Sequence, residues 1–232
     1  MAALAATSAF AQSTVTISGR MDALVRYTAK VAPGAANYSI TEDGGANTIR
    51  FAVVEDLGGG MRAVGDVGMR FGIIDGLTQS AGARPLFQGE TRVGVAGGFG
   101  TIKIGRGLTA VQGPLGLSEP FAGITAGAAR YAPGFATDYA AGGEARIDQA
   151  VFYNSPNMGG INLGLSWSPR KLSSTTATAS PWALTTTSTK THLSLYANYA
   201  AGPLSVSAGY EQNRVGDKMT PIWASYDAGV AR

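Results

Sequence analysis

Apolar and polar residues alternate along most of this chain, in segments of about ten residues. The clearest segment is 161–167, Ile-Asn-Leu-Gly-Leu-Ser-Trp, in which every second side chain is large and apolar. A period of two indicates a β-strand with one face in an apolar medium and the other face in water. The polar faces also carry charged residues, so they face water. The apolar faces of the strands would then all lie against one shared apolar medium.

The alternation predicts about ten strands and the start of another. Their expected ranges are 14–28, 47–56, 61–72, 89–96, 101–108, 148–155, 161–168, 190–201, 204–214 and 220–226. Short turns rich in Gly or Pro alternate with longer polar connections, among them 29–46, 109–147 and 169–189. This rhythm is typical of outer-membrane barrels, which have short periplasmic turns and longer extracellular loops. We therefore expect an all-β protein, an antiparallel transmembrane β-barrel.

A soluble β-sandwich, for example a carbohydrate-binding one, is the alternative architecture. Its two inner faces would have to meet in one bulky core. The apolar parity here includes Ala63, Gly65 and Ala208, which are too small to fill such a core. Outward aromatic residues fall near both ends of the strands, as in the two aromatic girdles of a membrane barrel. These observations favour the barrel.

Composition narrows the class further. The chain has 33 glycines, only 14% charged residues and no cysteine, which excludes disulfide scaffolds and thiolate metal sites. No apolar run reaches the roughly 18 residues of a transmembrane helix, so a membrane would be crossed by strands. The net charge of +3 is spread over scattered basic residues, and we expect no nucleic-acid partner.

The N-terminal residues have a different character. Residues 1–11 are rich in alanine and end in Ala9-Phe10-Ala11, which matches the small-residue cleavage site of a secretory signal. No basic residue precedes Arg20, so we expect a truncated signal-peptide remnant at 1–11, followed by the barrel portion at 12–232. A disordered alanine-rich tail is the alternative.

Several turns and their flanks resemble the hairpins of Gram-negative general porins. They are 55–60 (EDLGGG), 97–106 (GGFGTIKIGR), 153–160 (YNSPNMGG) and 199–206 (YAAGPLSV), and 17–22 (ISGRMD) is similar to the first strand of that family. The resemblance implies a barrel of about 16 antiparallel strands. It also implies a homotrimer, surrounded by outer-membrane lipid, through which small hydrophilic solutes and ions diffuse. With about ten strands, the chain is expected to be the N-terminal portion of such a barrel.

The resemblance also suggests where a pore would narrow. The 39-residue connection 109–147 is too long for a plain hairpin loop, and in porins the third long loop folds into the barrel. Strand parity places most strand charges on the water-facing side, where basic residues exceed acidic ones. The candidate constriction residues are, on the wall, Arg50, Arg70, Arg92 and Arg106, and on the loop, Glu119 and Asp138. Charges facing one another across a narrow aqueous pore select ions, and we expect weak anion preference; solvated rim charges are the alternative.

Arg106 departs from the parity rule because it alternates in phase with Ile102 and Ile104. The glycines on either side, Gly105 and Gly107, predict a β-bulge that turns the side chain inward. A place in a subunit interface is the alternative.

Other chemistry is not indicated. His192 is the only histidine, its parity puts it on the polar face, and we expect it to be solvated. No nucleophile, base and acid occur together in a motif, so we expect no enzyme activity, no cofactor and no metal site. The competing function is a surface adhesin or structural barrel that binds partners through long loops such as the Ser/Thr-rich segment 173–189.

Overall fold

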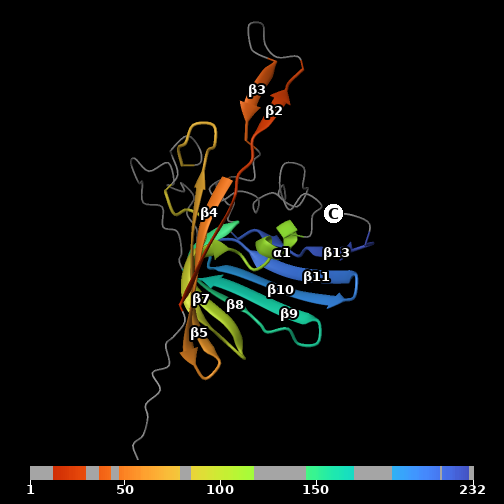
Figure 1. Ribbon diagram of the computed structural model, residues 1–232. Helices are drawn as coiled ribbons and strands as arrows, with labels where there is room; N and C mark the ends of the chain where they lie inside the picture. The colour runs from red at the N-terminus through yellow and green to blue at the C-terminus, as the bar shows by residue number, and fades with distance from the viewer. Residues whose placement is uncertain are drawn as a thin grey trace, which may run out of the picture.

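The computed structural model describes residues 13–29, 37–42, 47–78, 85–117, 145–169, 190–214 and 216–229. One antiparallel sheet of 11 strands makes up most of these residues (Figure 1). The expected signal remnant at 1–11, most of the connection 109–147 and the Ser/Thr-rich segment 173–189 lie outside the described residues.

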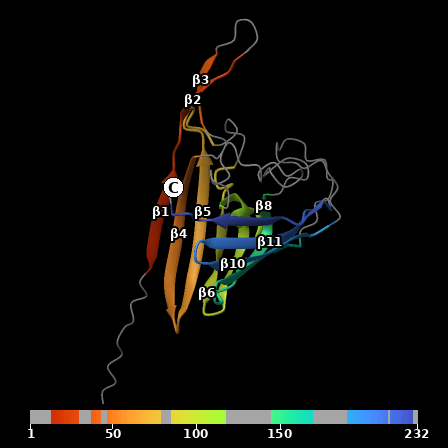
Figure 2. The same ribbon diagram turned by 90° about the vertical axis from the view of Figure 1, so that its right-hand side faces the viewer.

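From β1 to β11 the main sheet follows chain order, and each strand pairs antiparallel with the next strand of the sheet. Both of the last two strands pair with β11. The two views show that the sheet coils, so that β9, β10 and β11 run at a steep angle to β4 and β5 (Figures 1 and 2). The strands are β1 (Thr14–Arg20), β4 (Asn47–Gly58), β5 (Met61–Phe71), β6 (Thr91–Gly97), β7 (Gly100–Leu108), β8 (Arg146–Asn154), β9 (Ile161–Ser168), β10 (His192–Ala201), β11 (Leu204–Gln212), β12 (Lys218–Met219) and β13 (Ile222–Tyr226).

The N-terminal prediction was wrong in detail. The expected strand 14–28 is divided into β1 and β2 (Leu24–Tyr27), and the expected loop 29–46 contains β3 (Tyr38–Thr41). β2 and β3 form a separate two-stranded sheet that projects beyond the end of the main sheet (Figure 1). The β1–β4 ladder ends at the pair Arg20–Thr48. Two residues later, the Asp22 amide donates to the Asn47 side chain instead of continuing the ladder.

The strand predicted at 220–226 begins two residues later than expected, at Ile222. β12 ends before Pro221 and β13 begins after it. Proline has no N–H to donate to a ladder, so it breaks the hydrogen-bond pattern of a strand. The Pro221 carbonyl still accepts a hydrogen bond from the amide of Gly209, which keeps this region next to β11.

Burial in the sheet is the reverse of that in a soluble protein. Val93 is 60% exposed and Ile104 56% exposed on the outer face, whereas His192 and Glu211 on the inner face are fully buried. Leu163 and Leu195 are both exposed and share no interior. The soluble sandwich is therefore excluded, and the all-β barrel-wall prediction is confirmed, because an apolar outer face belongs in hydrocarbon.

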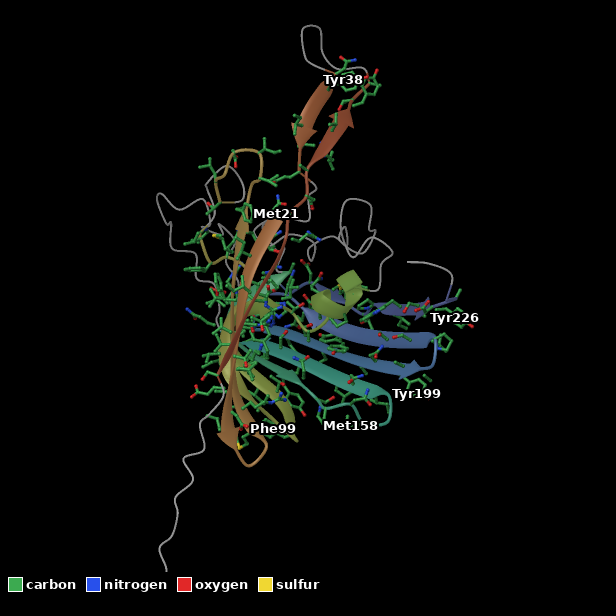
Figure 3. The ribbon with its side chains drawn as sticks, viewed as in Figure 1. Met21, Tyr38, Phe99, Met158, Tyr199 and Tyr226 are labelled. Atoms are coloured by element: carbon green, nitrogen blue, oxygen red, sulfur yellow. The ribbon has the colours of Figure 1, made fainter. Side chains whose placement is uncertain are left out.

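Aromatic and methionine side chains mark the ends of the sheet. Phe99, Met158 and Tyr199 lie at or beside the short turns, and all three are exposed (Figure 3). Rings with one apolar and one polar end are favoured at the membrane–water boundary. Among the described residues, no helix has the length and apolar character that crossing a membrane requires.

Candidate functional site

Three basic side chains converge on one buried carboxylate on the inner face of the sheet. The Asp66 side chain on β5 is fully buried. Its Oδ2 accepts hydrogen bonds from Arg92 Nη2 at 2.9 Å and Nε at 3.2 Å, and Arg50 Nη2 lies 3.5 Å away. Lys103 Nζ donates to the other oxygen, Oδ1. We call Asp66, Arg50, Arg92 and Lys103 the wall cluster.

The ladder explains why these residues meet. Asp66 and Arg92 are directly paired across β5 and β6, and directly paired residues project from the same face. Lys103 pairs with Gly94, two residues from Arg92, so its long side chain reaches Asp66 diagonally. Four adjacent strands thus each contribute one charged group from the water-facing parity.

A second ion pair lies beside the wall cluster. Glu90 Oε1 accepts from Arg146 Nε at 3.2 Å and from the Leu108 amide at 3.3 Å. The Arg92 guanidinium also stacks over the Phe152 ring, 5.2 Å from its centroid. The two groups together hold four basic side chains against two acidic side chains, a formal excess of two positive charges.

The start of the long connection lies against this inner face. A hollow of 260 Å³ separates the wall from the segment that holds α1 (Gln112–Leu117). Its lining includes Arg50, Glu90 and Arg92 from the charged groups and Pro114 and Thr109 from the segment. The charged groups therefore border a cavity between wall and segment.

Wall residues of β9, β10 and β11 anchor the first three residues of that segment. The Ala110 amide donates to Ser166 Oγ and the Val111 amide to Ser194 Oγ, both at 3.0 Å. The Thr109 hydroxyl donates to Glu211 Oε2 at 2.7 Å. These hydrogen bonds hold the backbone where the chain leaves β7, and we call residues 109–117 the anchored segment.

The candidate wall residues fall into two groups. Arg50 and Arg92 belong to the wall cluster, whereas the structure does not bring Arg70 and Arg106 to Asp66. Arg70 is buried near the end of β5. Arg106 Nε donates to the Gln88 carbonyl at 3.0 Å. The loop candidates, Glu119 and Asp138, lie outside the described residues.

A register shift occurs where the bulge beside Arg106 was expected. Gly105 pairs with Ala150 but Gly107 pairs with Ile147, so two residues of β8 lie opposite Arg106. The extra residue is therefore on β8, where Gln149 has a φ of 50°. Arg106 itself stays paired with Thr91 of β6.

Sequence reasoning placed Asp66, Lys103 and Glu90 on the polar parity but not among the candidate site residues. The tight turn between β6 and β7 fixes the register of these two strands. That register could have shown from the sequence that Lys103 lies diagonally opposite Arg92. The prediction for His192 was wrong. Its side chain is completely buried beneath the anchored segment, where Ser194, two residues along β10, bonds Val111.

Gly209 provides a test of how closely the anchored segment packs. A Cβ placed on Gly209 of β11 would lie 2.7 Å from Val111 Cγ2, and a glycine inside a strand often marks such a close approach. Gly209→Ala is expected to displace Val111 and to lower the free energy of unfolding by about 1–3 kcal/mol. Denaturant unfolding of the membrane-inserted protein measures the loss.

The matched control is Gly98→Ala, in the turn between β6 and β7, where an added Cβ meets no atom within 4 Å. This control should leave the unfolding midpoint unchanged. Equal midpoints for the two variants would contradict the close packing of Val111 on β11.

A sheet with an apolar outer face and a charged, partly covered inner face defines the wall of an outer-membrane barrel protein. The model of the Gram-negative porin family matches residues 1–232, and the chain belongs to that family. It is therefore a protein of the outer membrane of Gram-negative bacteria.

Individual relatives agree with this assignment. The chain is 31% identical over 252 residues to outer membrane porin protein 32 of Delftia acidovorans, and the match covers all of this chain and 66% of the relative. It superposes on the anion-selective porin from Comamonas acidovorans with a TM-score of 0.75, at 26% identity, over 94% of this chain and 65% of that one. A loop-deletion variant of OmpT of Vibrio cholerae shares the fold, with a TM-score of 0.60 at 15% identity, over 94% of this chain and 66% of that one. The chain thus spans just under two thirds of the length of these relatives.

Proposed function

We propose that the protein is a passive diffusion channel for small hydrophilic solutes and ions, with a preference for anions. The single observation that carries this proposal is the excess of basic over acidic groups in the wall cluster and the Glu90–Arg146 pair, which border the hollow beneath the start of the long connection. Fixed charges at a narrow aqueous passage raise the local concentration of counter-ions. The wall cluster and Arg146 would attract anions and repel cations.

Two further considerations support the proposal. The Comamonas relative is described as anion-selective, and its similarity extends over nearly the whole of this chain. Arg70, Arg106, Glu119 and Asp138 remain candidate constriction residues, and the family resemblance adds a homotrimeric assembly in outer-membrane lipid. With an infolded segment spanning 109–147, the loop carboxylates would face the basic wall.

Reversal potentials in planar lipid bilayers under a salt gradient test the selectivity. We expect the protein to pass chloride in preference to potassium. Arg50→Gln should reduce the chloride-to-potassium permeability ratio about fivefold, since one charge about 8 Å from a permeating ion stabilises an anion and destabilises a cation by about 0.5 kcal/mol each in water.

The matched control is Arg26→Gln, which removes the same charge from β2 in the projecting hairpin, outside the main sheet. That variant should keep the wild-type reversal potential. Cation preference in the wild type would refute the proposed anion selectivity, and the absence of conductance steps would refute the channel.

A surface adhesin is the second candidate, and the β2–β3 hairpin favours it. Its residues Val25 and Ile40 are paired on one face and are 70% and 68% exposed. On the same face the rings of Tyr27 and Tyr38 lie 5.0 Å apart. Such an exposed apolar face can bind a partner. An adhesin barrel that is plugged would give no stable open steps in the bilayer experiment.

A further inference from the structure

A histidine and a glutamate are buried together beneath the anchored segment. His192 Nε2 lies 3.4 Å from Glu211 Oε1, and both side chains are 0% exposed. Neither ring nitrogen of His192, nor Glu211 Oε1, has a hydrogen-bond partner among the described residues. A buried polar atom without a partner is costly, so this arrangement requires an explanation.

Two hydrogen-bond relays run from the anchored segment to the other carboxylate oxygen of Glu211, Oε2. The Val111 amide donates to Ser194 Oγ, and the Ser194 hydroxyl donates to Glu211 Oε2 at 3.0 Å. The Gln112 amide donates to Thr109 Oγ1 at 3.2 Å, and the Thr109 hydroxyl donates to the same Oε2. The two lone pairs of Oε2 accept one hydroxyl each, so this single oxygen holds both relays.

We propose that Glu211 is a positioning residue that holds the start of the segment on the wall, and that a proton on His192 strengthens this hold. The inference rests on the proposed channel function, because the segment borders the passage. A protonated His192 donates from Nε2 toward Glu211 Oε1 and compensates the buried negative charge. Without that proton the carboxylate charge stays buried and uncompensated, which weakens its contacts with Thr109 and Ser194.

The neighbouring charges do not substitute for His192. Arg214 pairs with Asp148 at 3.0 Å and donates to Ser168 Oγ at 2.9 Å, on the strand next to His192. Ser168 is the residue paired with His192 in the β9–β10 ladder. Lys190 lies two residues before His192, and its backbone amide donates a hydrogen bond to the Arg214 carbonyl. In the described part of the chain, His192 is thus the titratable group that faces Glu211 Oε1.

Hydrogen–deuterium exchange of the reconstituted protein tests this hold directly. After correction for intrinsic rates, the Val111 and Gln112 amides should exchange about tenfold more slowly at pH 6 than at pH 8, the change expected from one charge-assisted hydrogen bond. Ladder amides of β4 and β5 serve as the internal reference. Single-channel conductance over the same pH range reports the effect on the passage.

Two variants separate positioning from general stability. His192→Gln keeps a donor but cannot gain a charge, so the pH dependence of exchange and conductance should vanish. Glu211→Gln should speed exchange at Val111 and Gln112 at both pH values. The matched control is Glu55→Gln, an exposed β4 glutamate, which should behave as wild type.

The outcomes are distinct. Persistent pH dependence in His192→Gln, or wild-type exchange in Glu211→Gln, would overturn the inference. If amide exchange depends on pH in the wild type and this dependence is lost in His192→Gln, the inference is supported even if the wild type passes no current. That last result would count against the channel function alone.

Discussion

Ile104→Arg is expected to destabilise the membrane-inserted protein by about 2–4 kcal/mol. Ile104 lies at the centre of β7, is 56% exposed, and projects from the outer face with its ladder partners Val93 and Val151. A guanidinium at this position would enter hydrocarbon near the middle of the bilayer, where no water or counter-charge compensates it. Unfolding by guanidinium in phospholipid vesicles, followed by tryptophan fluorescence, measures the loss.

The matched control is Lys103→Arg, one residue along the same strand. It introduces the same side chain on the inner face, where Asp66 already binds a cation. We expect its stability to lie within about 0.5 kcal/mol of wild type. If both variants were equally stable, the assignment of the Ile104 face to lipid would be wrong.

The alternation of side chains predicted most of the sheet because the membrane imposes it on every strand. β9 has the bounds expected from its sequence, and β4, β5, β7 and β8 agree within two residues at each end. Where the chain leaves the membrane wall, this constraint disappears. That is why residues 14–28 were expected to form one strand although β2 belongs to the separate hairpin.

The inner face was harder to predict than the outer face. Parity placed Asp66 and Arg92 in water, but β5 and β6 are joined by a long connection that does not fix their register. His192 was expected to be solvated because parity does not reveal what covers a face. Residues 109–111, which are distant in sequence, cover part of the inner face of β9, β10 and β11. The packing of these residues depends on contacts such as that of Val111 with Gly209.

Asp66→Asn is expected to have two opposite effects, lower stability and stronger anion preference. The asparagine keeps the shape of the side chain but removes the charge that Arg50, Arg92 and Lys103 share. Removing one partner of a fully buried ion pair costs about 3–5 kcal/mol. Because the three cations are 16–45% exposed and can turn toward water, we expect about 2 kcal/mol here. The formal excess of the wall cluster and the Glu90–Arg146 pair rises from two positive charges to three, so the reversal potential should shift further toward that of chloride.

Glu90→Gln removes the same charge next to Arg146 and is the natural comparison for Asp66→Asn. It should shift the reversal potential in the same direction with a smaller loss of stability, since one cation rather than three loses its partner. Combining Asp66→Asn with Lys103→Gln restores the wild-type charge and should return both stability and selectivity part of the way. If Asp66→Asn unfolded at the wild-type midpoint, the three cations would not depend on this carboxylate. The positive charge of the inner face would then be held by contacts other than those of the wall cluster.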